Sequence, residues 1–158
     1  MIKITKSVLQ KALIAGFFSA LTIGVLTVLT YKSTLGYFIA ASFGSSMVLL
    51  FGFPESPFAQ PKNIFFGHLV SASVGIFFVN LIPLPIYISI AFAVGIGIFL
   101  MILLDVVHPP AGGNPILVII GSVSYDYLIF PVITGCIIII LLAIFINKLI
   151  LKKKYPLK

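Results

Sequence analysis

The sequence has no arginine, three acidic residues and one cysteine among its 158 residues. Charged residues make up 8% of the chain, against about a quarter in globular domains, so a soluble fold is excluded. The lone Cys136 rules out an intrachain disulfide. No nucleophile-elbow or zinc-protease motif is present, and the histidines and carboxylates lack a diagnostic metal-ligand spacing. We therefore expect no enzymatic activity, no metal and no cofactor.

Apolar residues are what the chain has in abundance: 61% are hydrophobic and the mean hydropathy is +1.28. A bilayer crossing needs roughly 20 consecutive apolar residues. Runs of this length are predicted at about 12–31, 64–82, 84–104 and 127–149. The composition and these runs predict an integral membrane protein without a soluble domain.

Two further apolar segments are shorter and are interrupted by small or polar residues. The first covers about 37–53 and contains "SFGSS", whereas the second covers about 110–121 and follows two prolines. Both are predicted to be short, broken or re-entrant helices. The expected fold is an all-α membrane protein, a compact multi-pass helical bundle that forms one domain over 1–158. It has four long spans plus the two short helices, and six crossings if both short helices cross.

Lysines at both ends of the chain indicate the topology. Cytoplasmic loops are enriched in lysine and arginine, so both termini are expected to be cytoplasmic and the number of crossings even. With six crossings Lys62 lies on the cytoplasmic side of the membrane and Lys32 on the opposite side, whereas with four crossings both lie on the opposite side. The composition, rich in lysine and isoleucine, favours a prokaryotic plasma membrane. The terminal lysines are Lys3, Lys6, Lys11, Lys148, Lys152, Lys153, Lys154 and Lys158.

The spacing of certain glycines raises the possibility of an internal repeat. Gly44 and Gly112 are 68 residues apart, and so are Gly67 and Gly135. Each half of the chain also has the order long span, short segment, loop, long span. Transporters are often built from such repeats, although two coincidences in a chain with 13 glycines can also arise by chance.

The stretch "HPPAGGNP", His108 to Pro115, concentrates helix-breaking residues in an apolar chain. Irregular backbone at membrane depth is tolerated only inside the protein or beside an aqueous cavity. Proline favours the first position of a helix, and a helix N-terminus offers unpaired N–H groups to an anion. We therefore expect an anion site between this stretch and the serines of the first short segment. The predicted substrate-binding residues are Ser42, Gly44, Ser45, Ser46, His108, Ala111, Gly112, Gly113 and Asn114.

Three ionisable residues are candidates for gating or proton coupling. His108 titrates near neutral pH and would donate to an anion or carry a proton, or else it only anchors the turn. Asp105 would share a helical face with His108 if the helix continued, although a solvated surface position explains it equally well. His68 lies one turn into a predicted span, where an ionisable group is costly.

Three sequence blocks together resemble the HPP family of integral membrane proteins. They are "SFGSSMVLLFG" (42–52), "SPFAQPKNIFFGH" (56–68) and "HPPAGGNP" (108–115), and the resemblance covers at least 37–117. It implies a compact multi-pass domain, commonly described with four spans, and nitrite transport as in plant plastid and cyanobacterial members. Asn114-Pro115 stands where family members are expected to have a small or hydroxyl residue, so the substrate of this chain need not be the nitrite of its relatives. The resemblance marks Ser42, Gly44, Ser45, Pro57, Gln60, Pro61, Gly67, His68, His108, Pro109, Pro110, Ala111 and Gly112.

Lys62 follows the marked Pro61 near a helix start, where it would add positive charge for an anion or face lipid headgroups. The predicted function is transport of a small inorganic anion, most simply nitrite or nitrate, between the segments with SFGSS and HPPAGG. The alternative is a structural or assembly subunit that transports nothing. The expected partners are the anion, the lipid bilayer and further copies of the chain in a homo-oligomer, but no nucleic acid.

Overall fold

The computed structural model describes residues 4–157, and that part of the chain is helical without any strand, as the composition predicts. Lys3 and Lys158, which contribute to the terminal charge, lie outside the described residues. The long elements are α1 (Lys6–Lys32), α3 (Pro61–Leu81), α4 (Ile86–Leu103) and a last span made of η4 (Leu128–Ile133), α6 (Thr134–Ile144) and η5 (Phe145–Ile150). The short elements are α2 (Ala41–Met47), η1 (Val48–Gly52), η2 (Pro57–Ala59), η3 (Pro109–Gly113) and α5 (Asn114–Gly121).

The starts of the long helices follow from their capping residues. Thr5 caps α1, because its side chain accepts the backbone N–H of Val8 at 3.3 Å. The helix therefore begins at Lys6, ahead of the predicted 12. Pro61 occupies the first turn of α3, where proline needs no hydrogen-bond partner. All four long helices are long and apolar enough to cross a membrane.

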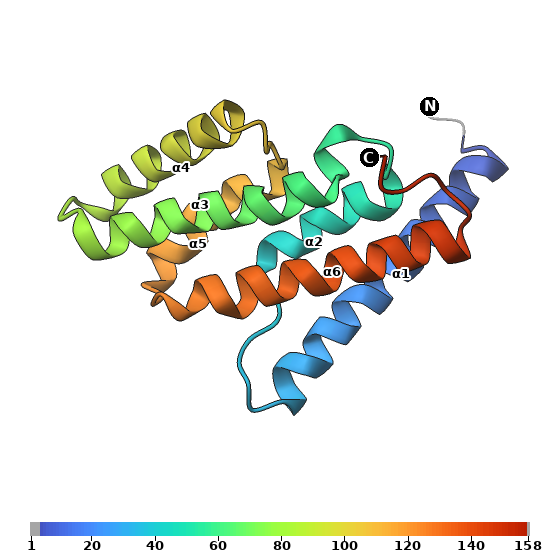
Figure 1. Cartoon of the computed structure of the whole chain (residues 1–158), viewed down its shortest axis with the longest axis horizontal. Helices are drawn as coiled ribbons and strands as arrows, with labels where there is room; N and C mark the ends of the chain where they lie inside the picture. The colour runs from blue at the N-terminus through green and yellow to red at the C-terminus, as the bar shows by residue number, and fades with distance from the viewer. Residues whose placement is uncertain (1–3, 158) are drawn as a thin grey trace.

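Contacts between loops define two ends of the bundle (Figure 1). Residues of α1 and of the segment after η5 line one hollow. Leu157 donates its backbone N–H to Gln60, just before α3, at 2.9 Å. Lys62, in the first turn of α3, lies 3.1 Å from Asp105, just after α4. These contacts bring together the starts of α1 and α3 and the ends of α4 and η5, and we call this region the lysine-rich end.

The opposite end contains the remaining helix termini. Gly36, after α1, shares a hollow with Asp126, before the last span. Leu84, between α3 and α4, shares another hollow with Ser122, after α5. The long helices therefore run alternately between the two ends. Because each short segment connects one end to the other, the described chain passes six times through the bundle.

Each short pass is half helix and half irregular chain. The first begins as extended backbone over 33–40, and only then forms α2 and η1, which run to the lysine-rich end. There the ammonium of Lys11 lies 4.3 Å from the centre of the Phe53 ring. The second short pass begins after α4 with irregular chain and η3, and only then forms α5, which runs to the opposite end. The two half-helices thus start inside the bundle and run in opposite directions (Figure 1).

The 68-residue repeat is visible in the contacts of two glycines. A Cβ on Gly67 in α3 would lie 2.9 Å from the carbonyl oxygen of Val106, in the second short pass. A Cβ on Gly135 in α6 would lie 2.6 Å from the carbonyl oxygen of Phe38, in the first short pass. Gly67 and Gly135 are 68 residues apart, and so are Phe38 and Val106. Each half therefore packs its third helix against the short pass of the other half, which agrees with two related halves of opposite direction.

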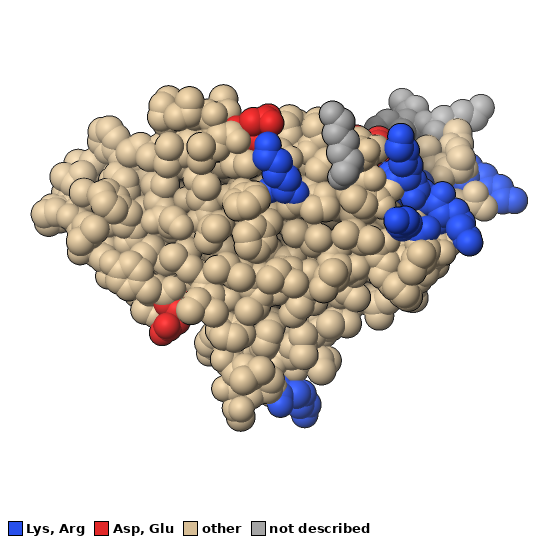
Figure 2. Space-filling view, viewed as in Figure 1, with Lys and Arg blue, Asp and Glu red and all other residues tan. Residues whose placement is uncertain are grey.

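The buried apolar residues form separate clusters, and each of the two described next combines residues from both halves of the chain. Leu26, Phe43, Leu50 and Ile139 belong to a buried cluster that joins α1, α2, η1 and α6. A second cluster, which includes Phe78, joins α3, α4 and α5. The face of the molecule shown in Figure 2 is mostly uncharged, and most of its lysines gather at the right, where α1 begins and the last span ends; the figure also shows one lysine beside an acidic residue and one at the bottom. An uncharged outer surface with charge at the ends is what a lipid environment requires.

Candidate functional site

The two short passes meet at a buried junction of polar side chains. Ser46 of α2 places its Oγ 2.8 Å from Nε2 of His108, the residue just before η3. The same oxygen lies 3.2 Å from Nε2 of His68 on α3. Asn114, the first residue of α5, lies 3.0 Å from Nδ1 of His68 through its Nδ2. We call these four residues, Ser46, His68, His108 and Asn114, the polar junction.

The hydrogen-bond directions in the junction are fixed from its two ends. At one end, Nδ1 of His108 lies 2.7 Å from the carbonyl oxygen of Phe58, which only accepts, so this nitrogen carries the proton. In a neutral ring Nε2 is then an acceptor, and it receives the hydroxyl proton of Ser46. At the other end, the amide Nδ2 of Asn114 also donates to the backbone oxygen of His68 at 3.2 Å, which sets its orientation. Nδ1 of His68 is therefore an acceptor, and Nε2–H of His68 donates to Ser46.

All four side chains of the junction are completely buried. The ring centres of His68 and His108 are 4.9 Å apart, and the ring of Phe43 packs edge-on against His68. Burying an ionised group away from water is costly, so neutral rings suit this position. Within residues 4–157 no group of three or more His, Cys, Asp or Glu side chains could hold a metal ion.

Two polar side chains of α3 hold the second short pass in place. Ser71 donates to the carbonyl oxygen of Ala111 at 2.7 Å, and Asn63 donates to that of Val107 at 2.9 Å. These bonds satisfy carbonyl groups that the irregular backbone leaves unpaired. Gly67 lies between them and permits close contact, because an added Cβ would lie 2.8 Å from the Cβ of His108.

The predicted glycines of the site border open space rather than packed neighbours. A Cβ added at Gly44, Gly112 or Gly113 would meet no atom within 4 Å. Gly44 and Ser45 are exposed on α2, whereas Gly112 and Gly113 are half-buried. These four residues therefore lie outside the polar junction, and they are the part of the predicted site that an approaching group can reach.

Of the two alternatives for Asp105, the structure shows the solvated surface position and not a pair with His108. α4 ends at Leu103, and Asp105 has a positive φ of 54°, so the helix does not continue to His108. Asp105 instead pairs with Lys62 at the surface, where its side chain is 96% exposed. The partner that orients His108 is the carbonyl oxygen of Phe58. An exposed ion pair of this kind contributes about 0–1 kcal/mol to stability.

The remaining motif residues shape the loop before α3 and the start of η3. Pro57 begins η2, and Pro109 and Pro110 begin η3. Gln60 donates from its amide to the carbonyl oxygens of Pro54 and Ser56 at 3.0 and 2.8 Å. The loop thereby presents the Phe58 carbonyl to His108.

Tyr155, which follows the last span, anchors the same loop. Its hydroxyl donates to the carbonyl oxygen of Ala59 at 2.8 Å. Burial raises the pKa of this phenol above its usual value, so it stays protonated and a donor.

A cavity of about 560 Å³ opens beside this loop at the lysine-rich end. Its lining includes Lys62 and Asp105, and also Asn63, which bonds to the residue next to His108. Asn63 therefore connects this cavity to the backbone beside His108. The motif residues Pro57, Gln60 and Pro61 complete its wall.

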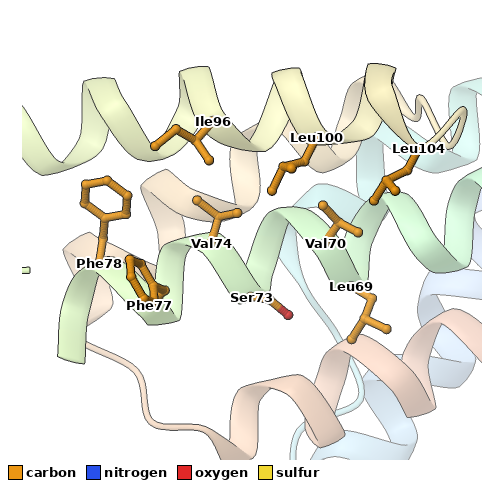
Figure 3. A pocket seen from close by; sticks show the side chains of 9 residues that line it. All are labelled: Leu69, Val70, Ser73, Val74, Phe77, Phe78, Ile96, Leu100 and Leu104. Carbon is orange, nitrogen blue, oxygen red and sulfur yellow. The ribbon is translucent and has the colours of Figure 1, made fainter. Parts of the chain in front are cut away.

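A different cavity, of about 620 Å³, lies between α3 and α4 (Figure 3). Its lining is apolar except for Ser73, as the side chains of Val74, Phe77, Ile96 and Leu100 illustrate. Such a groove on the outer surface of two membrane helices suits a lipid tail. It holds none of the junction residues.

Sequence reasoning identified the four junction residues but not their mutual bonds. It missed the role of Ser71, although this residue lies three positions after His68 and hence on the same face of the helix. It also missed the Phe58 carbonyl, because every residue has a backbone carbonyl and the residue type does not show which one contacts His108. Four buried side-chain atoms have no hydrogen-bond partner within the described part of the chain: Thr22 Oγ1, Ser42 Oγ, Asn114 Oδ1 and Asn147 Oδ1.

A bundle of apolar spans around a buried polar junction defines a multi-pass helical membrane protein. Sequence comparison gives the family. Residues 4–156 match the family described as "HPP, transmembrane region", and the chain belongs to this family. The resemblance noted in the sequence is thereby confirmed, and the match extends beyond 37–117 at both ends.

Two curated relatives are transmembrane proteins of Dictyostelium discoideum. One is 35% identical over 142 residues, which cover 84% of this chain and 46% of the relative. The other is 32% identical over 143 residues, which cover 84% of this chain and 50% of the relative. The chain therefore spans about half the length of the curated relatives it matches. No solved structure matches it significantly.

Proposed function

We propose that this membrane protein transports a small inorganic anion, nitrite or nitrate, across the bilayer. The observation that carries the proposal is the contact of Ser46 with both His68 and His108, because it joins the two short passes inside the bundle. Ionisable side chains inside a membrane domain are costly and are typical of substrate or proton pathways. Half-helices that start inside the bundle are a further feature of secondary transporters.

The cavity at the lysine-rich end offers an entrance for an anion. Lys62 supplies positive charge at its wall, and Asn63 connects the wall to the backbone beside His108. Gly112 and Gly113 lie directly before Asn114, the junction residue at the start of α5, and a helix N-terminus offers N–H groups to an anion. The proposal includes no catalytic step, metal or cofactor.

The finer assignment of location is also part of the proposal. The shared position of both chain ends at the lysine-rich end, together with the positive-inside rule, supports cytoplasmic termini. A prokaryotic plasma membrane remains our interpretation of the composition, whereas the two relatives above come from a eukaryote.

A structural or assembly role is the second candidate. It is favoured by the closed state of the junction, in which the side chains bond to each other rather than line a cavity. Hydrogen-bonded polar networks rigidify a core, and in this junction every side-chain N–H and O–H group has a partner while Asn114 Oδ1 has none. This role predicts that variants of the junction lose stability but that the wild-type protein carries no flux.

Anion uptake into proteoliposomes separates the two candidates. The wild-type protein is compared with His108→Ala and Gly112→Leu, each confirmed to reconstitute as a folded protein, with nitrate and nitrite as separate probes. We expect uptake by the wild type and about a tenfold or greater loss in His108→Ala, since a hydrogen bond to a charged group is worth about 1.5–3 kcal/mol. Gly112→Leu should also lose uptake, because its side chain would obstruct the start of α5. Ser73→Ala is the matched control, because Ser73 lies on α3 but lines the outer groove.

Protein-free vesicles give the background, which matters because nitrous acid crosses lipid unaided. Wild-type uptake no faster than this background with either probe would contradict transport. It would favour the structural role over transport of nitrite or nitrate. Equal uptake by all variants would contradict the location of the site.

A further inference from the structure

The polar junction has no N–H or O–H group left to offer an anion while both histidines are neutral. The His108 Nδ1 proton is bonded to Phe58, and the His68 Nε2 proton to Ser46. The hydroxyl proton of Ser46 is bonded to His108 at 2.8 Å. The donors therefore form one directed chain from Asn114 to Phe58. An anion that enters this site needs a hydrogen-bond donor, and the four junction side chains have none free while both histidines are neutral.

A proton added to Nε2 of His108 supplies that donor. The new N–H of His108 donates to Ser46 Oγ, which already accepts from His68, and a hydroxyl oxygen has two lone pairs for these two bonds. The Ser46 hydroxyl proton is then released from His108. The protein acceptor left to it is the carbonyl oxygen of Ser42, at 3.3 Å, which is the longest of the three contacts that Ser46 Oγ makes. An anion that accepts this proton therefore competes only with that long contact.

The charge balance of the surroundings requires that proton and anion arrive together. His68 is the titratable group that faces His108, and α2, α4, η2, η3 and α5 have no charged residue. The charged pair nearest in the chain, Lys62 and Asp105, is neutral as a pair and lies at the surface. A single charge in the buried junction would lack compensation, whereas an imidazolium beside an anion forms a neutral pair.

We propose that the junction binds its anion only together with one proton, taken up on His108 Nε2, with Ser46 as the residue that couples the two. This inference rests on the proposed transport function and specifies its substrate as an anion plus a proton, moved without net charge. The proton comes from water on the entry side and is released with the anion on the other side. No covalent bond of the anion is made or broken. Ser46 is a binding residue, and Phe58 acts by positioning His108.

The test measures proton and nitrate fluxes together in proteoliposomes with the wild-type protein. Nitrate is the main probe because its acid is strong and does not cross lipid unaided. We expect one proton to be taken up per nitrate and the uptake rate not to respond to an imposed membrane potential. While the proton site is far from saturated, lowering the outside pH by one unit should make uptake about tenfold faster. Nitrate flux that follows the potential and brings no proton would overturn the inference but leave transport intact.

A binding measurement on the same protein does not depend on flux. Nitrogen-15 NMR of labelled histidine distinguishes the two neutral tautomers and the charged ring. Without anion we expect His108 as the Nδ1–H tautomer and His68 as the Nε2–H tautomer. Saturating nitrate at neutral pH should convert His108 to the doubly protonated form. Nitrate binding with both rings unchanged, or no nitrate binding at all, would overturn the inference; absence of flux with both probes would instead overturn the proposed function.

Discussion

At the scale of single residues, Ser46 is central to the site because its hydroxyl contacts both buried histidines. Its hydroxyl is both donor and acceptor, and it lies between two buried imidazoles that cannot bond to water. The neighbouring Ser45, one position earlier on α2, is exposed and makes none of these contacts. Position on the helix, rather than residue type, therefore separates the two serines.

Ser46→Ala should lower the free energy of unfolding by about 1–3 kcal/mol, because it leaves two buried ring nitrogens with a lost partner. Denaturant unfolding in detergent measures the change. Ser45→Ala on the same helix is the control and should stay within about 0.5 kcal/mol of the wild type. Equal effects of the two substitutions would contradict the bond assignment at Ser46.

Much of the site could be predicted from residue types, because buried histidine, serine and asparagine are conspicuous in an apolar chain. His68, His108, Ser46 and Asn114 were all predicted as site residues, and the structure brings them together. What the sequence could not provide was the path of the backbone after α4. The pairing of Asp105 with His108 assumed a continuous helix, but the positive φ of Asp105 turns the chain away.

At the scale of elements, the two short passes explain why the segment lengths were ambiguous. Each has too few helical residues to cross alone, and the irregular half of the pass completes the distance. Hydropathy predicts helices but not extended chain at membrane depth, so four and six crossings remained open from sequence. The carbonyl contacts of Gly67 and Gly135 are what allow the extended parts to lie against α3 and α6.

Gly67→Ala and Gly135→Ala should both be destabilising, by about 1–3 kcal/mol or more, since each added methyl group would overlap backbone of a short pass. Gly135→Ala should be at least as destabilising as Gly67→Ala, because its added methyl group would overlap the Phe43 ring as well as the Phe38 carbonyl. Gly16→Ala is the control on α1, where an added Cβ meets nothing within 4 Å. Thermal unfolding in detergent compares the three variants. A neutral Gly135→Ala together with a destabilising Gly67→Ala would contradict this expectation.

At the scale of the whole molecule, one exposed stripe is unusual for a surface in contact with lipid. It follows the two half-helices through the middle of the bundle, and its members in the first half lie 68 residues before members in the second half. Half-buried 3₁₀ backbone at Gly112 and Gly113 belongs to it, and such backbone needs protein rather than lipid beside it. Small residues at its centre allow close helix contact. The stripe consists of Ala41, Gly44, Ser45, Val48, Pro109, Gly112, Gly113, Ile116, Leu117 and Ile120.

We propose that a second copy of the chain covers this stripe in a homo-oligomer. Ser45→Cys in a Cys136→Ala background should give disulfide-linked dimers in membranes under mild oxidation, as seen on a non-reducing gel. Phe99→Cys, on the exposed face of α4, is the control and should remain monomeric. Cross-linking of the control but not of Ser45→Cys would place the contact elsewhere and contradict the proposal.

The matched glycine contacts also have a consequence for the ancestry of the chain. If both halves descend from one three-pass ancestor, their opposite directions mean that the ancestral protein had to insert into the membrane in both orientations. Such an ancestor could not have had a strong bias of lysine toward one side, because that bias would have fixed a single orientation. The concentration of lysines at the outer ends of the present chain is then a later feature, acquired once fusion of the two copies had made one orientation permanent.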